Sequence, residues 1–309
     1  MRILLIGQAR FGEAVFQALQ EEGERIVGVS APPADRAGAP DPLWRAAEDA
    51  GLPRFETGRL KRPEVYEELA ALEPDLGVMA FVTHILPERV LDLPRHGTIQ
   101  YHPSLLPRHR GRTAIAWAIA QGDSTTGVTV FWVDKGIDTG PILLQREAPI
   151  GPDDTTASLY YKTLFPMGVD ALVEATKLVR EGRAPRIPQD EARATYEHPF
   201  GDEHALIDWH RPAREVYALV RAANPQPGAL TLLDGRPLRI LDCALGEPAA
   251  APPGLALDAT SHGLRIALPD GTLLARRVAF DGGPKISAAD FLHATGLRLP
   301  FSLDGVRPA

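Results

Sequence analysis

The sequence contains almost no cysteine and no long apolar run. Cys243 is the single cysteine among 309 residues, which excludes an intrachain disulfide and a thiolate metal cluster. A lone thiol is more often a small core residue than a nucleophile, and we expect Cys243 to be one. No window approaches the ~18 consecutive apolar residues that a membrane span needs. The first residues also lack the long apolar stretch of a signal peptide, so we expect a cytoplasmic protein with no membrane partner.

Positive charge is scarce as well. The chain has 33 basic and 40 acidic residues and a formal net charge of −7, so it has no overall basic field of the kind that neutralises nucleic-acid phosphates. Hydrophobic residues make up 44% of the chain and charged residues 24%, which excludes global disorder. The length suggests about two domains.

A strand, a helix and a second strand follow one another at the N-terminus. The apolar run 3–6 ends at Gly7, apolar residues then repeat at helical spacing as far as Leu19, and residues 25–29 are typical of a strand. This order predicts a right-handed crossover in a doubly wound, Rossmann-like α/β sheet. We expect further strands over 76–81, 98–101 and 128–133, and a helix over 154–182 that breaks at Pro166.

The turn from Gly7 to Gly12 does not fit a dinucleotide-binding fingerprint. Ala9 stands where the pattern G-x-G-x-x-G requires its second glycine, and no acidic residue closes the second strand. We therefore expect no NAD or flavin site in this turn.

The C-terminal third has the pattern of a small antiparallel domain. The polar, proline-containing segment 183–204 is expected to connect two domains, which places an α/β domain over 1–204 and a smaller domain over 205–309. A helix is expected over 212–223. Two hairpins should follow, because strand patterns flank Asp234-Gly235 and Asp270-Gly271, and several hairpins in about 100 residues predict a small antiparallel β-barrel.

A histidine ends one of the expected strands. Residues 97–111 read GTIQYHPSLLPRHRG, so a strand runs into His102, and two prolines stiffen the loop behind it. The carboxyl edge of a doubly wound sheet is where such folds bind ligands, and imidazole can hold or pass a proton near neutral pH. Taken alone, such a histidine is more often structural, and we expect Ser104 to be a hydrogen-bonding residue of the loop.

An aspartate follows another expected strand. Residues 134–140 read DKGIDTG, and Gly136 and Gly140 on either side of Asp138 predict a tight loop that presents a carboxylate. Paired with His102, Asp138 could orient the ring and favour the imidazolium; alone it is equally well a turn residue. The histidines at 84, 96, 102 and 109 lack the short helical spacing of metal ligands, so no metal site is expected.

These two segments together resemble the signature of the folate-dependent formyltransferase family. HPSLLPRHRG (102–111) and GIDTG (136–140) carry the resemblance, and IDWHRPAREVYALVRAANPQPGALT (207–231) is similar to the start of the family's C-terminal domain. Within the family, IGQARFGEAVFQAL (6–19) and LYYKTLFPMGV (159–169) most resemble the N-terminal hydrolase domains of 10-formyltetrahydrofolate dehydrogenases. The methionyl-tRNA formyltransferases are the other close relatives.

The resemblance implies that 10-formyltetrahydrofolate is the formyl donor, bound by the Rossmann-like domain, and that the C-terminal barrel is OB-like. The family's catalytic His corresponds to His102 and its catalytic Asp to Asp138. The family's transferases carry Asn where Gln100 stands; Gln keeps the amide but adds a methylene, so Gln100 is either a substitute oxyanion donor or a filler of space. The folate contacts correspond to His84, Ile85, Leu86, Ser104, Leu105, Leu106, Pro107, Gly136, Ile137 and Gly140.

The local distribution of charge indicates which molecule accepts the formyl group. The loop 31–43 has Arg36 against Asp35 and Asp41, a sum of −1 that disfavours contact with a tRNA acceptor stem. The cluster Arg108, His109, Arg110 and Arg112 either binds a sugar-nucleotide phosphate or a polyglutamate tail, or is a solvated loop. We expect formyl transfer to water, giving tetrahydrofolate and formate, or to a small amine. Methionyl-tRNA formylation is the alternative, and a catalytically weak folate-binding module, supported only by Gln100, is the third.

Overall fold

The computed structural model describes residues 1–35 and 37–305. Arg36, the basic residue of the loop 31–43, therefore lies outside the described residues. The chain divides into two compact units. The N-terminal unit contains Met1–Arg112, Thr126–Ala148 and Tyr161–Tyr196, and the C-terminal unit contains Thr113–Thr125, Pro149–Tyr160 and Glu197–Ala309.

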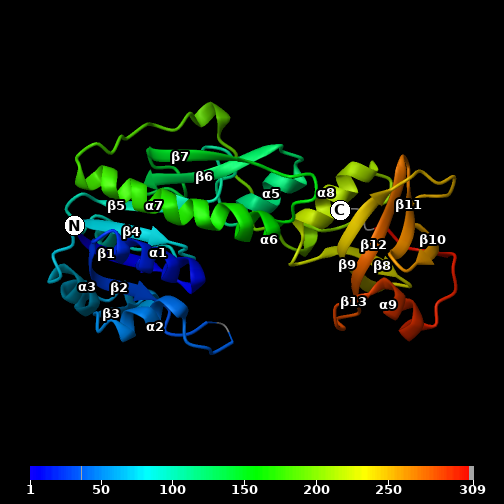
Figure 1. The fold of residues 1–309 in the computed structure, drawn as a ribbon, viewed down its shortest axis with the longest axis horizontal. Coiled ribbons are helices and arrows are strands. Elements are labelled where there is room, and N and C mark those ends of the chain that lie inside the picture. Colours follow the sequence, from blue (N-terminus) through cyan, green and yellow to red (C-terminus); the bar gives the residue numbers. More distant parts are fainter. Residues whose placement is uncertain (36, 306–309) are drawn as a thin grey trace. The chain divides into compact units, whose positions relative to one another are not determined.

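A mostly parallel sheet forms the centre of the N-terminal unit (Figure 1). Its strand order is β3-β2-β1-β4-β5-β6-β7, and β1 to β5 pair in parallel. This confirms the doubly wound α/β sheet and the three further strands expected from the sequence. The strands are β1 (Arg2–Gly7), β2 (Arg25–Ala31), β3 (Arg54–Glu56), β4 (Leu76–Ala80), β5 (Thr98–His102), β6 (Thr125–Trp132) and β7 (Ile142–Pro149).

Helices cover both faces of this sheet because β1 is apolar on both sides. Leu4 and Ile6 pack into one cluster with Val65 and Leu69 of α3, whereas α1 and α7 lie together (Figure 1). Phe11 of α1 stacks on a β5 tyrosine, with ring centroids 4.5 Å apart. The helices of this unit are α1 (Ala9–Glu21), α2 (Pro42–Asp49), α3 (Pro63–Ala70), α4 (Glu88–Leu91) and α7 (Phe165–Arg180), with the 3₁₀ turns η1 (Thr57–Arg59) and η3 (Glu191–Arg193).

The helix expected over 154–182 is interrupted, as Pro166 predicted. A short helix, α6 (Thr156–Leu159), leads into a π-helical turn, η2 (Tyr160–Leu164), and α7 begins directly after it. Pro166 lies in the first turn of α7, where its missing N–H leaves no hydrogen bond unmade.

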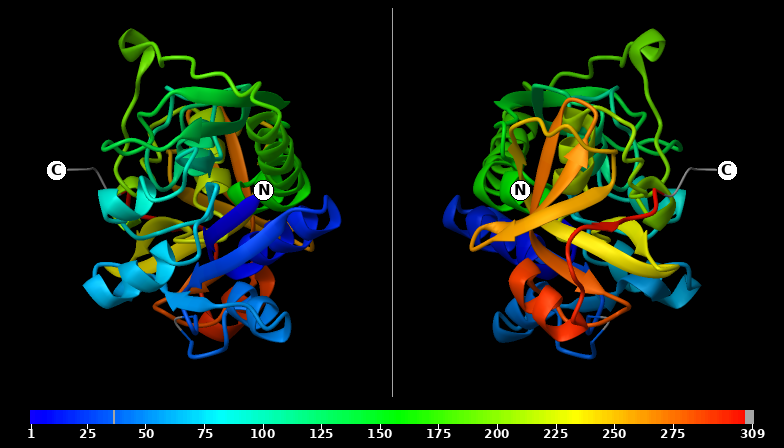
Figure 2. Two further views of the ribbon diagram at one scale, coloured as in Figure 1. Left: turned by 90° about the vertical axis from the view of Figure 1, so that its left-hand side faces the viewer. Right: turned by 90° about the vertical axis from the view of Figure 1, so that its right-hand side faces the viewer.

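An antiparallel sheet forms the centre of the C-terminal unit. Its order is β14-β10-β11-β12-β9-β8, with β13 beside β12. Asp304, which follows β14, bridges to Leu232 of β8, so the two edges of the curled sheet are linked, and Figure 2 shows its yellow and orange strands crossing as the sheet curls. The elements are α5 (Ala114–Ala120), η4 (Asp202–His204), α8 (Ala213–Ala222), β8 (Ala229–Leu233), β9 (Arg236–Gly246), β10 (Leu255–Thr260), β11 (Gly263–Leu268), β12 (Gly271–Phe280), β13 (Ile286–Ser287), α9 (Ala288–Thr295) and β14 (Phe301–Ser302).

Both expected hairpins are present, the second with its turn shifted by one residue. Asp234 and Gly235 have φ of 50° and 74°, the positive values that the commonest two-residue hairpin turn requires. In the second hairpin Leu268 pairs with Gly271. The turn residues there are therefore Pro269 and Asp270, and Gly271 belongs to β12, not to the turn as the sequence suggested.

Within the described part of the chain, every helix is too short or too polar to cross a bilayer.

Candidate active site

His102 is the last residue of β5 and is almost fully buried, with 4% of its surface exposed. The loop behind it turns back at His109, whose φ is +56°, and this brings the His109 carbonyl oxygen to 2.8 Å from Nε2 of His102. A carbonyl oxygen can only accept a hydrogen bond, so the contact assigns a proton to Nε2. The other ring nitrogen, Nδ1, faces Asp138.

Three polar groups converge on the buried carboxylate of Asp138. Its Oδ2 accepts a hydrogen bond from the Gly111 N–H at 2.8 Å and lies 3.5 Å from Nδ1 of His102. Gln100 donates from Nε2 to Oδ1 at 3.5 Å, a long hydrogen bond. The structure thus brings together His102, Asp138 and Gln100. Because Nε2 carries a proton, a neutral His102 has its lone pair on Nδ1, and a second ring proton on Nδ1 would face the Asp138 carboxylate.

The path of the backbone that brings Asp138 next to His102 was not predicted from the sequence. β6 runs antiparallel to β5, so Trp132 at its end pairs with Ile99 near the start of β5. The loop 133–141 must therefore fold back over the face of β5 that carries Gln100 and His102, since residues two apart in a strand share a face. Gly140 permits this return, because a Cβ there would lie 1.7 Å from the Trp132 carbonyl oxygen.

The residues expected to contact folate fall into two groups by exposure. His84, Ile85, Gly136 and Ile137 are exposed, and they lie on the segment after β4 and on the loop after β6. Leu86, Ser104, Leu106, Pro107 and Gly140 are buried, and Leu105 is half-buried. Ser104 donates from Oγ to the Arg108 carbonyl oxygen at 2.7 Å, which is the loop hydrogen bond expected of it.

Exposed apolar side chains and left-handed backbone gather in these loops. Phe81, Ile85 and Ile137 are 45%, 80% and 53% exposed. The turns that follow β1, β4, β5 and β6 each hold a non-glycine residue with φ between 56° and 61°, namely Ala9, Phe81, His109 and Asp138. Such conformations cost energy and cluster at functional sites, and exposed apolar groups beside a few polar ones suit a flat ligand.

The basic cluster after His102 does not offer Arg110 to a ligand. The Arg110 side chain is 2% exposed, and its guanidinium donates to both carboxylate oxygens of Glu191 at 2.7 and 2.9 Å. The expectation that Arg110 could bind an external phosphate or polyglutamate is wrong, because its buried guanidinium is already paired with Glu191.

Sequence reasoning missed the residues that hold the site in place. They lie in the segment after α7, which was expected only to connect domains but runs back beside β7 (Figure 1). Gln189 donates to the carbonyl oxygens of Asp138 and Gly140, and the Tyr196 hydroxyl donates to the Ile137 carbonyl oxygen. The segment has no periodicity, and its partners lie some fifty residues away, so no local pattern indicates these contacts.

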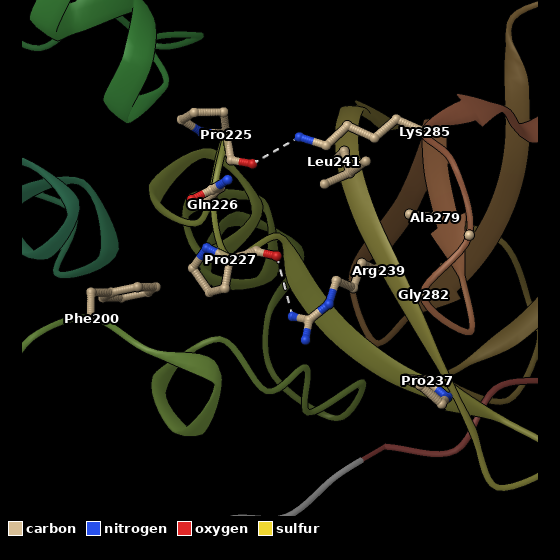
Figure 3. Close-up of a pocket in the computed structure, with 11 residues that line it drawn as sticks. Phe200, Pro225, Gln226, Pro227, Pro237, Arg239, Leu241, Ala279, Gly282 and Lys285 are labelled. Carbon is tan, nitrogen blue, oxygen red and sulfur yellow. Dashed lines mark hydrogen bonds between the residues drawn. The ribbon is translucent and has the colours of Figure 1, made fainter. Parts of the chain in front are cut away.

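A hollow of about 750 Å³ lies in the C-terminal unit (Figure 3). Its edge has two hydrogen bonds, from Lys285 to the Pro225 carbonyl oxygen and from Arg239 to that of Pro227. The described lining contains no His, Asp or Glu, so the hollow offers no acid–base pair comparable to His102 and Asp138. It is lined by Phe200, Pro225, Gln226, Pro227, Pro237, Arg239, Leu241, Ala279, Gly282, Gly283 and Lys285.

Comparisons with known proteins agree with both units. Residues 1–176 match the formyl transferase family, and residues 201–296 match the formyl transferase C-terminal domain. The chain is 41% identical over 306 residues to the cytosolic 10-formyltetrahydrofolate dehydrogenase of Xenopus laevis, covering 94% of this chain and 34% of the relative. It therefore spans about a third of that relative's length.

Two further likenesses cover nearly all of this chain. The methionyl-tRNA formyltransferase of Geotalea daltonii is 37% identical over 308 residues, which is 97% of this chain and 98% of the relative. The crystal structure of HypX from Aquifex aeolicus in complex with tetrahydrofolic acid aligns with a TM-score of 0.70 at 22% identity, over 94% of this chain and 47% of that chain. The latter is a likeness of fold.

Proposed function

Because this chain belongs to the formyl transferase family, we propose that it removes the formyl group of 10-formyltetrahydrofolate and transfers it to water or a small amine. Transfer to water gives tetrahydrofolate and formate. The observation that carries the proposal is the buried pair of His102 and Asp138, 3.5 Å apart, on the β5 face of the α/β sheet.

The donor is proposed from the loops around this pair and from the relatives. Ile85 and Ile137 offer exposed apolar surface to a pterin ring, and loop backbone can supply its hydrogen bonds. The dehydrogenase relative is named for 10-formyltetrahydrofolate, and the HypX structure contains tetrahydrofolic acid. The proposed folate contacts are His84, Ile85, Leu86, Ser104, Leu105, Leu106, Pro107, Gly136, Ile137 and Gly140.

The proposed reaction is nucleophilic attack on the formyl carbon at N10. A bond forms between that carbon and the oxygen of water or the nitrogen of an amine, and the carbonyl electrons move onto oxygen. The Nδ1–H of protonated His102 donates to this oxyanion, since Nε2 is held by the His109 carbonyl, and Asp138 accepts the nucleophile's proton. The oxyanion electrons then re-form the carbonyl, and Asp138 passes its proton to N10 as the C–N10 bond breaks, which releases tetrahydrofolate and formate or the N-formyl amine.

Gln100 is proposed to orient Asp138. Its amide nitrogen points to Oδ1 of that carboxylate, so in this arrangement the amide is engaged with Asp138 and not presented to the formyl oxygen. The oxyanion would then depend chiefly on His102. A weaker oxyanion site limits the rate but leaves the reaction possible.

Water or a small amine is preferred as acceptor over tRNA. The loop 31–43 has one basic residue, Arg36, against Asp35 and Asp41, which is too few for extensive contact with tRNA phosphates. The methionyl-tRNA formyltransferase relative, matched over its whole length, keeps that reaction as the second candidate. We also propose a cytoplasmic location and an OB-like C-terminal barrel, the latter because the sheet edges are linked.

One assay separates the candidates. Purified chain is incubated with 10-formyltetrahydrofolate alone, and tetrahydrofolate is followed by absorbance and formate by a coupled assay. Equal release of both products without an acceptor supports hydrolysis. Turnover that begins only with an amino sugar or with charged initiator tRNA supports the corresponding transfer. Folate binding without turnover under every condition would contradict the proposal and support a binding module.

A further inference from the structure

The segment 189–196, here called the strap, contacts both loops of the proposed site. Gln189 donates from Nε2 to the carbonyl oxygens of Asp138 at 2.9 Å and Gly140 at 2.8 Å. Its Oε1 accepts from Nε and Nη2 of Arg110 at 3.2 and 2.8 Å. The amide therefore joins the loop that carries the carboxylate to the loop that follows His102, and both of its N–H groups are used for the carboxylate loop.

An ion pair between Arg110 and Glu191 holds the strap on the side of Gln189 that faces away from Asp138. The Arg110 guanidinium is buried, and an unpaired buried charge is costly. Its two hydrogen bonds to the Glu191 carboxylate offset that cost and keep the guanidinium next to Gln189. This bond raises the pKa of Arg110 and lowers that of Glu191. Arg110 is thus a permanent cation that holds Oε1 of Gln189 and, by fixing the amide, aims its two N–H groups.

Backbone contacts tie the strap to the His102 side as well. The Arg110 N–H donates to the Thr195 carbonyl oxygen at 3.0 Å, and the Thr195 N–H donates to that of Pro107 at 3.2 Å. The His109 N–H donates to Oγ1 of Thr195 at 2.8 Å. The strap therefore supports the carbonyl group that holds Nε2 of His102 and, through Gln189, the backbone that carries Asp138.

We propose that Gln189 is a positioning residue that sets the distance between Asp138 and His102. Asp138 has φ of +57°, and the carbonyl oxygens of Asp138 and Gly140 both turn toward the strap, so two donors on one nitrogen are needed to hold them. Without these donors the loop can shift, and a shift of about 1 Å in a reacting group can cost about 10²-fold in rate. This inference rests on the role proposed above for Asp138.

The test is Gln189→Glu, which keeps an oxygen acceptor for Arg110 but replaces both N–H donors with an oxygen that repels the two carbonyl groups. An acceptor for Arg110 is thereby preserved while the donation to the Asp138 loop is lost, and Gln189→Met, which loses both donors without adding a charge, should give the same fall in kcat. We expect kcat for tetrahydrofolate release to fall by about 10- to 100-fold, with a much smaller change in KM, and the loss of two hydrogen bonds also lowers Tm. Arg193→Ala, an exposed change within the same strap, should match the wild type.

A double-mutant cycle identifies the group through which Gln189 acts. On an Asp138→Asn background, Gln189→Glu should cause little further loss, because a residue that acts through Asp138 has nothing left to position. Full additivity, or wild-type kcat in Gln189→Glu, would overturn the inference. Gln189→Met, which keeps the length and loses both donors, is held to the same criteria if Gln189→Glu fails to fold. If the wild type shows no turnover, the proposed function fails; if the wild type and Asp138→Asn behave as proposed but Gln189→Glu keeps wild-type kcat, only the inference about Gln189 fails.

Discussion

The side chains of His102 and Asp138 each have defined backbone or side-chain partners, so single substitutions can test their roles. His102 has a backbone carbonyl at one ring nitrogen and a carboxylate at the other. Asp138 in turn receives a backbone N–H from Gly111. Because the His109 carbonyl oxygen holds Nε2, Nδ1 is the ring nitrogen left for the substrate, and it is therefore the proposed hydrogen-bond donor to the oxyanion.

Ile85 tests whether the exposed apolar surface binds folate. Its side chain is 80% exposed, so Ile85→Ser should leave folding unchanged. Burying an Ile side chain is worth about 1.5–3 kcal/mol, so we expect KM for 10-formyltetrahydrofolate to rise by roughly tenfold, with little change in kcat. Ile187, 54% exposed in the same unit, is the matched control, and Ile187→Ser should have no effect. Equal KM values for the two variants would remove Ile85 from the folate site.

The pKa of Glu191 tests whether its ion pair with Arg110 forms in solution. Its hydrogen bond from Arg110 lowers its pKa, so in an NMR titration its carboxyl midpoint should fall below the ordinary value of about 4.3. A lowered folded pKa means that this contact stabilises the fold above the unfolded pKa and is lost as the pH falls through the folded one. An Arg110→Met variant should return the midpoint to the ordinary range; a normal midpoint in the wild type would show that the pair is not formed in solution.

At the scale of elements, strands and hairpins follow from sequence patterns, whereas the site depends on contacts that leave no pattern. The run 3–6 predicts β1 because it is apolar throughout, and Asp234-Gly235 predicts its turn because the turn needs positive φ. The direction of β6 was not predictable, since an apolar strand fits either direction. The role of Gln189 was not predictable either, because a polar residue in an aperiodic segment is typical of any surface loop.

The loop between β6 and β7 depends on Gly140. A Cβ at this position would lie 1.7 Å from the backbone of Trp132, so Gly140→Ala must displace the loop. Overpacking of this kind costs about 1–3 kcal/mol, and we expect a lower Tm together with a loss of kcat, because Asp138 lies two residues away. Gly58→Ala is the control, since its Cβ would meet nothing closer than 3.8 Å. Wild-type kcat in Gly140→Ala would show that the loop's path does not set the Asp138 position.

At the scale of the whole molecule, each unit has its own core, and the single thiol reports on one of them. Cys243 lies in β9 of the C-terminal unit and is 7% exposed, and burial raises its pKa well above the ordinary value. A buried thiol of this kind is unreactive. We expect no reaction with a thiol reagent in the native chain, and labelling in denaturant that keeps pace with the loss of β-sheet circular dichroism. Rapid labelling of the native protein would contradict the burial of Cys243.

The similarity to known formyl transferases extends over nearly the whole chain and not over a single motif. The chain matches about a third of the dehydrogenase relative and nearly all of the methionyl-tRNA formyltransferase relative. Both matches cover most of the α/β unit and of the antiparallel unit that follows it in the sequence. The central claim therefore concerns the histidine–aspartate pair and not the identity of the acceptor.

The most direct test measures folate binding and tetrahydrofolate release in the same samples of wild type, His102→Ala and Asp138→Asn. We expect both variants to bind the donor with a dissociation constant within about threefold of the wild type and to lose about 10²- to 10⁴-fold in turnover, the usual contribution of a positioned proton-transfer group. Full turnover in either variant, with the binding intact, would contradict it.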